Sequence, residues 1–161
     1  MKISKSVCKI ALVQAEPVMF DKAKSLDKAL KLIRESAANG AELIVFPELS
    51  ISAYSCRDIF FNDLLLQKSR EALLDIAAFS TDIDALIFVG LPISRNGKLY
   101  NVAAAVNNGH ILGLVPKLNV PNYGEFYETR QFTPGFIEPT EIRIGDEFVP
   151  FGAGLLFECV G

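Results

Sequence analysis

Cysteine and histidine are scarce in this sequence of 161 residues, which contains three cysteines and one histidine. Cys8, Cys56 and Cys159 form no C-x-x-C pair, and His110 stands alone. A structural zinc site needs about four such ligands at close spacing, so we expect no bound metal. A sparse, odd cysteine count also excludes a disulfide framework and favours a reducing compartment, so we expect a cytoplasmic protein.

Long apolar runs and clusters of basic residues are also missing. No stretch approaches the roughly 18 uncharged apolar residues of a transmembrane helix, and the N-terminus lacks the apolar core of a signal peptide. The formal net charge is −3 and the basic residues are scattered, so we expect neither nucleic acid nor membrane as a partner. What is present is a hydrophobic share of 50% with 22% charged residues, which is typical of a folded domain with a core.

The first half of the chain has the pattern of an α/β fold. Residues 9–14 and 43–46 are apolar runs of the length of buried strands. Between them, an apolar stripe over residues 26–37 predicts a helix. Ser25 is the expected N-cap and Gly40 the expected stop. Such a β-α-β unit implies a right-handed crossover between parallel strands.

The second half mixes a further helix with antiparallel strands. Asn107-Asn108-Gly109 predicts a hairpin between strands at 99–106 and 110–114, because Asn-Gly tolerates the positive φ of a tight turn. The other expected elements are a loop (49–61), a helix (about 63–79), a buried strand (85–90), an ordered loop with one helical turn (117–135) and two weaker strands (142–144 and 155–157). No covering helix follows the last strand, so we expect a fragment that ends before its domain is complete.

Glu48 is the first candidate for chemistry. It comes directly after Phe46-Pro47, at the carboxyl end of an expected parallel strand, where α/β folds place ligands. Pro47 cannot continue the strand ladder, so the chain must turn there and can present Glu48 to a cavity. A partly desolvated glutamate has a pKa suited to a general base. The alternative is a solvated loop glutamate.

Lys117 is the second candidate, and it follows the hairpin in Val115-Pro116-Lys117. A fixed cation at that position can stabilise the oxyanion that develops during acyl transfer. The alternative is an ordinary surface lysine. Neither Glu48 nor Lys117 is convincing when it is taken alone.

Four segments in chain order change that assessment. They are Phe46-Pro-Glu-Leu-Ser, Tyr100-Asn-Val-Ala-Ala-Ala-Val-Asn-Asn-Gly, Gly113-Leu-Val-Pro-Lys and Glu128-Thr-Arg-Gln-Phe-Thr-Pro-Gly. The series closely resembles the carbon–nitrogen hydrolase (nitrilase) superfamily over nearly the whole chain. Within that superfamily, the stretch 117–132 and the loop 49–60 look most like the N-terminal glutaminase domain of glutamine-dependent NAD synthetases.

The resemblance implies a fold and a catalytic set. The fold is a nitrilase-like four-layer αββα sandwich, incomplete in this chain. In the Glu-Lys-Cys set, Glu48 matches the general base that takes the thiol proton, and Lys117 matches the residue that holds the tetrahedral oxyanion. Glu128 matches the second glutamate, which orients the lysine and the substrate nitrogen.

The resemblance also implies a glutamine pocket lined by Tyr123, Phe126 and, less directly, Tyr54, although ordinary core packing is the alternative for such aromatic residues. The family nucleophile lies in a strand-to-helix elbow farther past the lysine than this chain reaches. Cys159 is followed by Val-Gly and does not match that elbow, so we expect a buried structural thiol. Without a thiolate we expect the fragment alone to be inactive.

Residues 1–161 would then be the N-terminal portion of the glutaminase domain. The rest of that domain and a synthetase domain that uses ATP and Mg would lie outside this sequence, and no cofactor is expected within it. Ammonia from glutamine would convert nicotinate adenine dinucleotide to NAD, in an expected homo-oligomer. Two alternatives stay open: a free-standing nitrilase-family amidase or carbamoylase, and a non-catalytic nitrilase-like scaffold.

Overall fold

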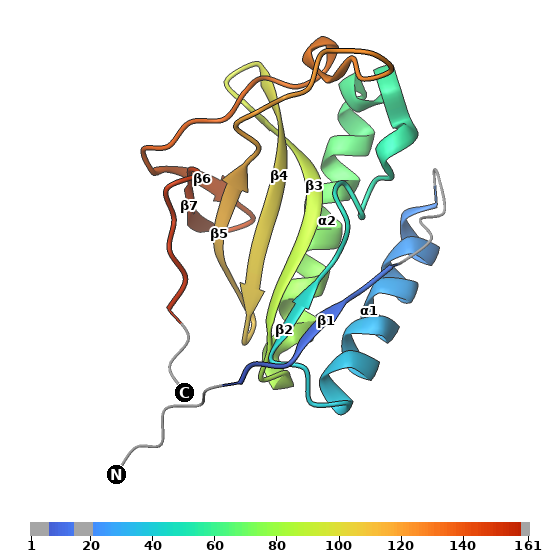
Figure 1. The fold of residues 1–161 in the computed structure, drawn as a ribbon, viewed down its shortest axis with the longest axis vertical. Helices are drawn as coiled ribbons and strands as arrows, with labels where there is room; N and C mark the ends of the chain where they lie inside the picture. The colour runs from blue at the N-terminus through green and yellow to red at the C-terminus, as the bar shows by residue number, and fades with distance from the viewer. Residues whose placement is uncertain (1–6, 15–20, 159–161) are drawn as a thin grey trace.

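The computed structural model describes residues 7–14 and 21–158. Within these ranges, seven strands form one sheet in the order β1-β2-β3-β4-β5-β7-β6, and two α-helices lie together beside it (Figure 1). The strands are Ile10–Leu12 (β1), Leu43–Val45 (β2), Leu86–Arg95 (β3), Lys98–Asn107 (β4), His110–Pro116 (β5), Thr140–Ile144 (β6) and Glu147–Phe151 (β7). The helices are Lys22–Ala38 (α1) and Asp63–Phe79 (α2), with 3-10 helices at Tyr54–Phe61 (η1), Ser80–Asp82 (η2) and Glu128–Arg130 (η3).

Parallel pairing in the first half confirms the expected β-α-β arrangement. β1 pairs with β2 and β2 with β3, both parallel. From β3 to β5 the sheet is an antiparallel meander. The expected hairpin turns at Asn108 (φ 45°) and Gly109 (φ 84°). A second turn, at Asn96 (φ 51°) and Gly97 (φ 72°), was not anticipated, and it extends β3 five residues past the expected end at 90.

Capping decides where α1 begins. The Asp21 side chain accepts a hydrogen bond from the Lys24 amide at 3.0 Å, so the helix starts at Lys22. The expectation that Ser25 caps the helix is therefore wrong, because an earlier acceptor already satisfies a free amide of the first turn. Gly40 is confirmed as the stop: its φ is 77° and its amide donates to Ala37 O at 2.8 Å. The helix expected at 63–79 is confirmed as α2.

Alternate residues of the sheet face the two helices and form the main core. Ile87 and Val89 of β3 are buried there with Ile33 of α1 and Ile76 of α2. The opposite side, which we call the helix-free face, has no helix over it among the described residues. These residues therefore supply one sheet and one helix layer, two of the four layers expected.

Two strand expectations need correction. β1 is not buried on both sides: Leu12 is 82% exposed, because it points to the helix-free face. The segment 155–157 is not a strand; β7 lies earlier and pairs with β6 across a turn at Gly145. Phe157 instead packs over the helix-free face, with its ring edge-on to Phe88 at 5.6 Å between centroids. The expected loop at 49–61 contains η1.

Candidate active site

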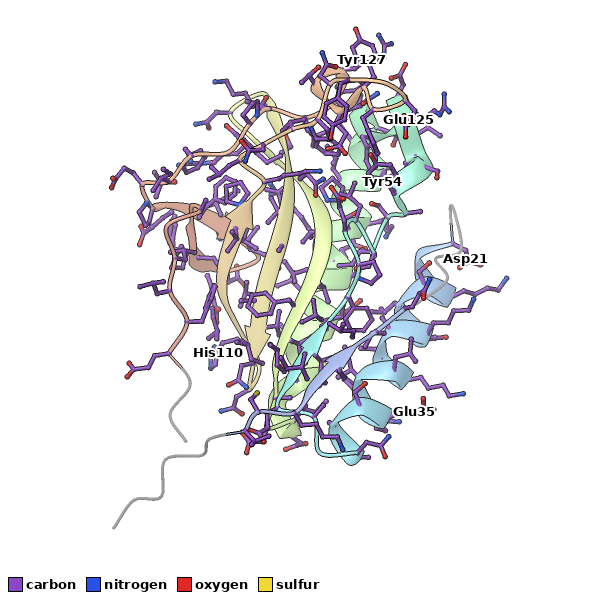
Figure 2. All side chains as sticks on the ribbon, in the orientation of Figure 1. Asp21, Glu35, Tyr54, His110, Glu125 and Tyr127 are labelled. Carbon is purple, nitrogen blue, oxygen red and sulfur yellow. The ribbon has the colours of Figure 1, made fainter. Side chains whose placement is uncertain are left out.

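A pocket of about 460 Å³ lies where the ends of β2 and β5 meet the loops that follow them. It is lined by Pro47, Glu48, Tyr54, Lys117, Pro121, Tyr123, Phe126 and Glu128. All six residues singled out in the sequence are in this lining. Tyr54 lies at the same end of the molecule as the loop carrying Glu125 and Tyr127 (Figure 2).

Glu48 lies in a tight turn, residues 47–50, whose backbone packs directly against β3. The Ser50 amide donates to Pro47 O at 3.2 Å, and the Ile51 amide donates to Gly90 O at 3.1 Å. A Cβ at position 90 would lie 2.7 Å from Pro47 O, so only glycine permits this approach. The strand end and the turn together aim the carboxylate of Glu48 into the pocket.

Asn101 of β4 supports Glu48 and was missed in the sequence. This buried side chain, 4% exposed, donates from Nδ2 to Glu48 Oε1 at 2.5 Å. The backbone carbonyl oxygen of Asn101 accepts from the Lys117 amide at 2.8 Å. A signal was available, because Asn101 is a lone polar residue in an apolar strand and lies within a segment that carries the family resemblance.

Lys117 is fixed through both its backbone and its ammonium group. Besides the bond to Asn101, its carbonyl accepts from the Gly135 amide at 2.8 Å. Its Nζ lies 2.7 Å from Glu48 Oε1, and 2.9 Å and 3.2 Å from the two carboxylate oxygens of Glu128. Lys117 is therefore not an ordinary surface lysine but bridges two carboxylates.

Glu128 is the buried member of the cluster, with its side chain 8% exposed against 42% for Glu48. It lies in η3, and its Oε1 also accepts from the Tyr54 hydroxyl at 2.6 Å. These donors offset the cost of burying the charge. Glu48 is therefore the more accessible of the two carboxylates to a bound molecule, whereas Glu128 is held by Lys117 and Tyr54.

Protonation states follow from these contacts. Desolvation opposes the charge on Lys117, but the hydrogen bonds and negative charges of Glu48 and Glu128 outweigh it and raise the pKa of the ammonium. Desolvation, followed by the hydrogen bond to Glu128, raises the pKa of Tyr54 above its usual range. At neutral pH, Lys117 is a cation and Tyr54 a hydrogen-bond donor.

Two aromatic side chains form one wall of the pocket. Tyr123 is 72% exposed and Phe126 36% exposed, and their rings meet edge to face with centroids 5.8 Å apart. The alternative that they are ordinary core residues is wrong. Exposed aromatic rings beside a charged cluster are available to cover a bound ligand.

Glu48 and Lys117 border a second hollow as well. This groove of about 440 Å³ lies on the helix-free face and is lined mostly by apolar residues of β3, β4 and β5, among them Phe88, Ala103 and Val115. The pair can therefore be reached from two sides.

None of the cysteines in the described ranges lines the pocket. Cys8 is exposed. Cys56 is buried, its Sγ donates to Ser52 O at 2.9 Å, and burial raises the pKa of its thiol. Cys159 lies outside the described residues. Within those ranges no group of three or more potential ligands is arranged to hold a metal ion, and no helix is long and apolar enough to span a membrane.

Comparison with known proteins agrees with this architecture. The carbon-nitrogen hydrolase family matches residues 9–158. A glutamine-dependent NAD(+) synthetase from Mycobacterium tuberculosis is 40% identical over 149 residues, which are 92% of this chain and 22% of that protein. One from Thermotoga maritima is 34% identical over 138 residues, 86% of this chain and 24% of that protein.

Among solved structures, a glutamine-dependent NAD(+) synthetase from Cytophaga hutchinsonii superposes with a TM-score of 0.84 at 31% identity, over 90% of this chain and 25% of that one. The chain thus spans about a quarter or less of the length of these relatives. The family resemblance and the nitrilase-like α/β fold expected from the sequence are confirmed. The chain belongs to the carbon-nitrogen hydrolase family.

Proposed function

We propose that this chain is the N-terminal part of a glutaminase domain that hydrolyses the side-chain amide of glutamine. The ammonia would supply an ATP- and Mg-dependent conversion of nicotinate adenine dinucleotide to NAD in a further domain of the same protein. The observation that carries the proposal is the cluster of Glu48, Lys117 and Glu128 at the wall of one pocket. The names of its relatives support glutamine as the substrate.

In the proposed reaction, Glu48 takes the proton of a cysteine thiol, and the sulfur attacks the amide carbonyl carbon. The cysteine is not among the described residues that line the pocket, and the groove on the helix-free face offers a route to Glu48 and Lys117. The carbonyl oxygen becomes an oxyanion, which the ammonium of Lys117 stabilises.

Collapse of this intermediate breaks the C–N bond, and the proton held by Glu48 passes to the departing ammonia. Water, deprotonated by Glu48, then attacks the thioester, and glutamate and the free thiol are released. Glu128 does not exchange protons in this scheme. Its two oxygens keep Lys117 directed at the oxyanion.

The charge of the pocket is complementary to the α-ammonium group of an amino-acid amide. Glu48 and Glu128 contribute two negative charges and Lys117 one positive charge, so the lining is net negative. Such a lining favours a ligand with an ammonium group, and the wall formed by Tyr123 and Phe126 can shield the amide from bulk water.

The test is release of ammonia and glutamate from glutamine by the full-length protein, together with glutamine-dependent NAD formation. Glu48→Gln removes the base and is expected to lower kcat by roughly 10²–10⁴-fold. Glu35→Gln, at an exposed glutamate of α1, is the matched control and should be neutral. Release of ammonia from nitriles or other amides but not from glutamine would refute the substrate. Equal activities of the two variants would refute the role of Glu48.

A further inference from the structure

A second link joins η1 and η3 outside the pocket. The carboxylate of Asp58 accepts from Arg130 Nε and Nη2, both at 2.7 Å, and from Gln131 Nε2 at 2.9 Å. These contacts span 72 and 73 residues of sequence. The hydrogen bonds from Arg130 and then Gln131 lower the pKa of Asp58 to about 2, so the carboxylate is charged at any physiological pH. None of the three residues lines the pocket.

The elements joined by this link are those that carry two pocket residues. η1 holds Tyr54 and Asp58, and η3 holds Glu128 and Arg130. Inside the pocket Tyr54 donates to Glu128, and outside it Asp58 accepts from Arg130. The two bridges therefore fix the same pair of elements at two separate points, which restricts rotation as well as separation.

Packing beneath the bridges is apolar. Phe60 of η1 and Phe132, just after η3, have ring centroids 5.0 Å apart in a small core cluster. The Phe132 amide donates to Glu128 O at 2.8 Å, so this packing is tied to the backbone of Glu128. Aromatic packing keeps the two elements together but leaves them free to slide, whereas a bidentate Arg–carboxylate pair sets their direction.

One residue directly before η1 and one within it have backbone conformations that depend on support from surrounding contacts. Ala53 has φ 78°, and Arg57, directly before Asp58, has φ 49° and ψ −129°. Residues other than glycine persist in these regions only where the surrounding contacts hold them. Ala53 is buried at 3% exposure and Phe60 packs on Phe132, whereas Asp58 lies at the surface, where its contact to Arg130 supports the backbone next to Arg57.

We propose that Asp58, with Arg130 and Gln131, is a positioning clamp that holds Glu128 against Lys117. Both side chains of the ion pair are about half exposed, at 54% and 51%, and exposed pairs add little to global stability. Breaking the clamp is expected to change the position of Glu128 relative to Lys117 instead. When η3 moves relative to η1, Glu128 loses its short contacts to Lys117, and the cation is no longer directed at the substrate carbonyl.

The experiment compares Asp58→Asn with Asp146→Asn in the full-length protein. Asp146 also pairs with an arginine at the surface, through Arg143 at 3.3 Å, but it is fully exposed and is not part of the pocket. The first readout is the reactivity of Lys117 toward trace acetic anhydride as a function of pH, quantified by mass spectrometry. In Asp58→Asn the labelling midpoint of Lys117 should shift to lower pH, because the raising effect of Glu128 is lost. In Asp146→Asn it should not move.

The second readout is kinetic and rests on the glutaminase function proposed above. Asp58→Asn should lower kcat for glutamine hydrolysis roughly tenfold to a hundredfold and change KM little, because orientation rather than binding is lost. Arg130→Lys keeps the charge but cannot form the bidentate pair, so it should act in the same direction and replaces Asp58→Asn if that variant does not fold.

The labelling readout needs no substrate, so it decides the clamp even if the full-length protein does not hydrolyse glutamine. In that case the proposed function fails and the clamp is judged on Lys117 alone. If Asp58→Asn and Arg130→Lys both leave the Lys117 labelling profile as it is in Asp146→Asn, the clamp does not position Glu128 and the proposal is overturned.

Discussion

Replacing Gly90 by alanine would disturb the support under Glu48 without altering any ionisable group. The added Cβ would lie 2.4 Å from the Leu49 nitrogen, 2.7 Å from the Pro47 oxygen and 3.0 Å from the Glu48 carbonyl carbon. All three atoms belong to the backbone, so no side chain can rotate out of the way. Reaching an ordinary contact of 3.4 Å from 2.4 Å requires a displacement of about 1.0 Å.

The size of the effect follows from that displacement. Forcing a methyl group into a packed site costs about 1–3 kcal/mol, which for a domain of this size lowers Tm by roughly 2–12 °C. A misplacement of about 1 Å in a catalytic group can cost on the order of a hundredfold in rate. Gly90→Ala should therefore combine a moderate loss of stability with a large loss of kcat.

The assay measures urea denaturation and glutamine hydrolysis in the full-length protein. Gly97→Ala is the matched control, because its φ is 72° but an added Cβ would meet nothing within 4 Å. It should lose about 1–2 kcal/mol through its left-handed backbone and keep its kcat. A Gly90→Ala protein with kcat within about twofold of wild type would refute the reasoning, since a shift of about 1 Å is expected to cost far more.

The polar groups around the pocket give three more expectations. Glu128→Gln removes a carboxylate that raises the pKa of Lys117, so competitive labelling should show a lower pKa for Lys117. The kcat should also fall roughly 10²–10³-fold. An unchanged labelling profile of Lys117 would count against an interaction between Glu128 and Lys117. Asn101→Leu removes a buried donor to Glu48 and should cost about 1–3 kcal/mol in urea denaturation, whereas an unchanged stability would contradict that bond. Asp58 has a folded pKa of about 2 against a usual 3.8, so its stabilisation is present above pH 3.8 and is lost as the pH falls toward 2. Because the pair is exposed, the difference in stability between wild type and Asp58→Asn should be small. Denaturation at successive pH values should show that difference closing over this window, and a constant difference would disprove the linkage.

Features set by local chemistry could be predicted from the sequence. The helix at 63–79, the stop at Gly40 and the turn at Asn108-Gly109 each depend on residues within a few positions of one another. The Asn96-Gly97 turn carries the same Asn-Gly signal and was missed, so β3 was predicted too short. The error at 155–157 has another cause: an apolar run indicates contact with the core, but here Phe157 packs on a sheet face without strand pairing while Leu156 is 97% exposed.

Some residues of the candidate site could be predicted from the sequence, and others could not. Glu48 and Lys117 were found because strand ends and family-like segments mark them in the sequence. Asp58 was not, because nothing in its sequence neighbourhood marks it and its partner Arg130 is 72 residues away. Asn101 was not either, although it is a lone polar residue in an apolar strand, because its bond to Glu48, 53 residues away, is known only from the tertiary contacts. Supporting residues become visible only when the tertiary contacts are known.

The distances in sequence between the pocket residues have a consequence for folding. Glu48 and Lys117 are 69 residues apart, and Tyr54 and Glu128 are 74 apart, whereas the β4–β5 hairpin closes through neighbouring residues. Closing long loops costs conformational entropy before any contact repays it. The meander is therefore expected to form first and the pocket last. In native-state hydrogen exchange, amides at 121–131 should exchange through openings of lower free energy than those of β4. The segment that carries part of the pocket would then unfold locally before the meander does.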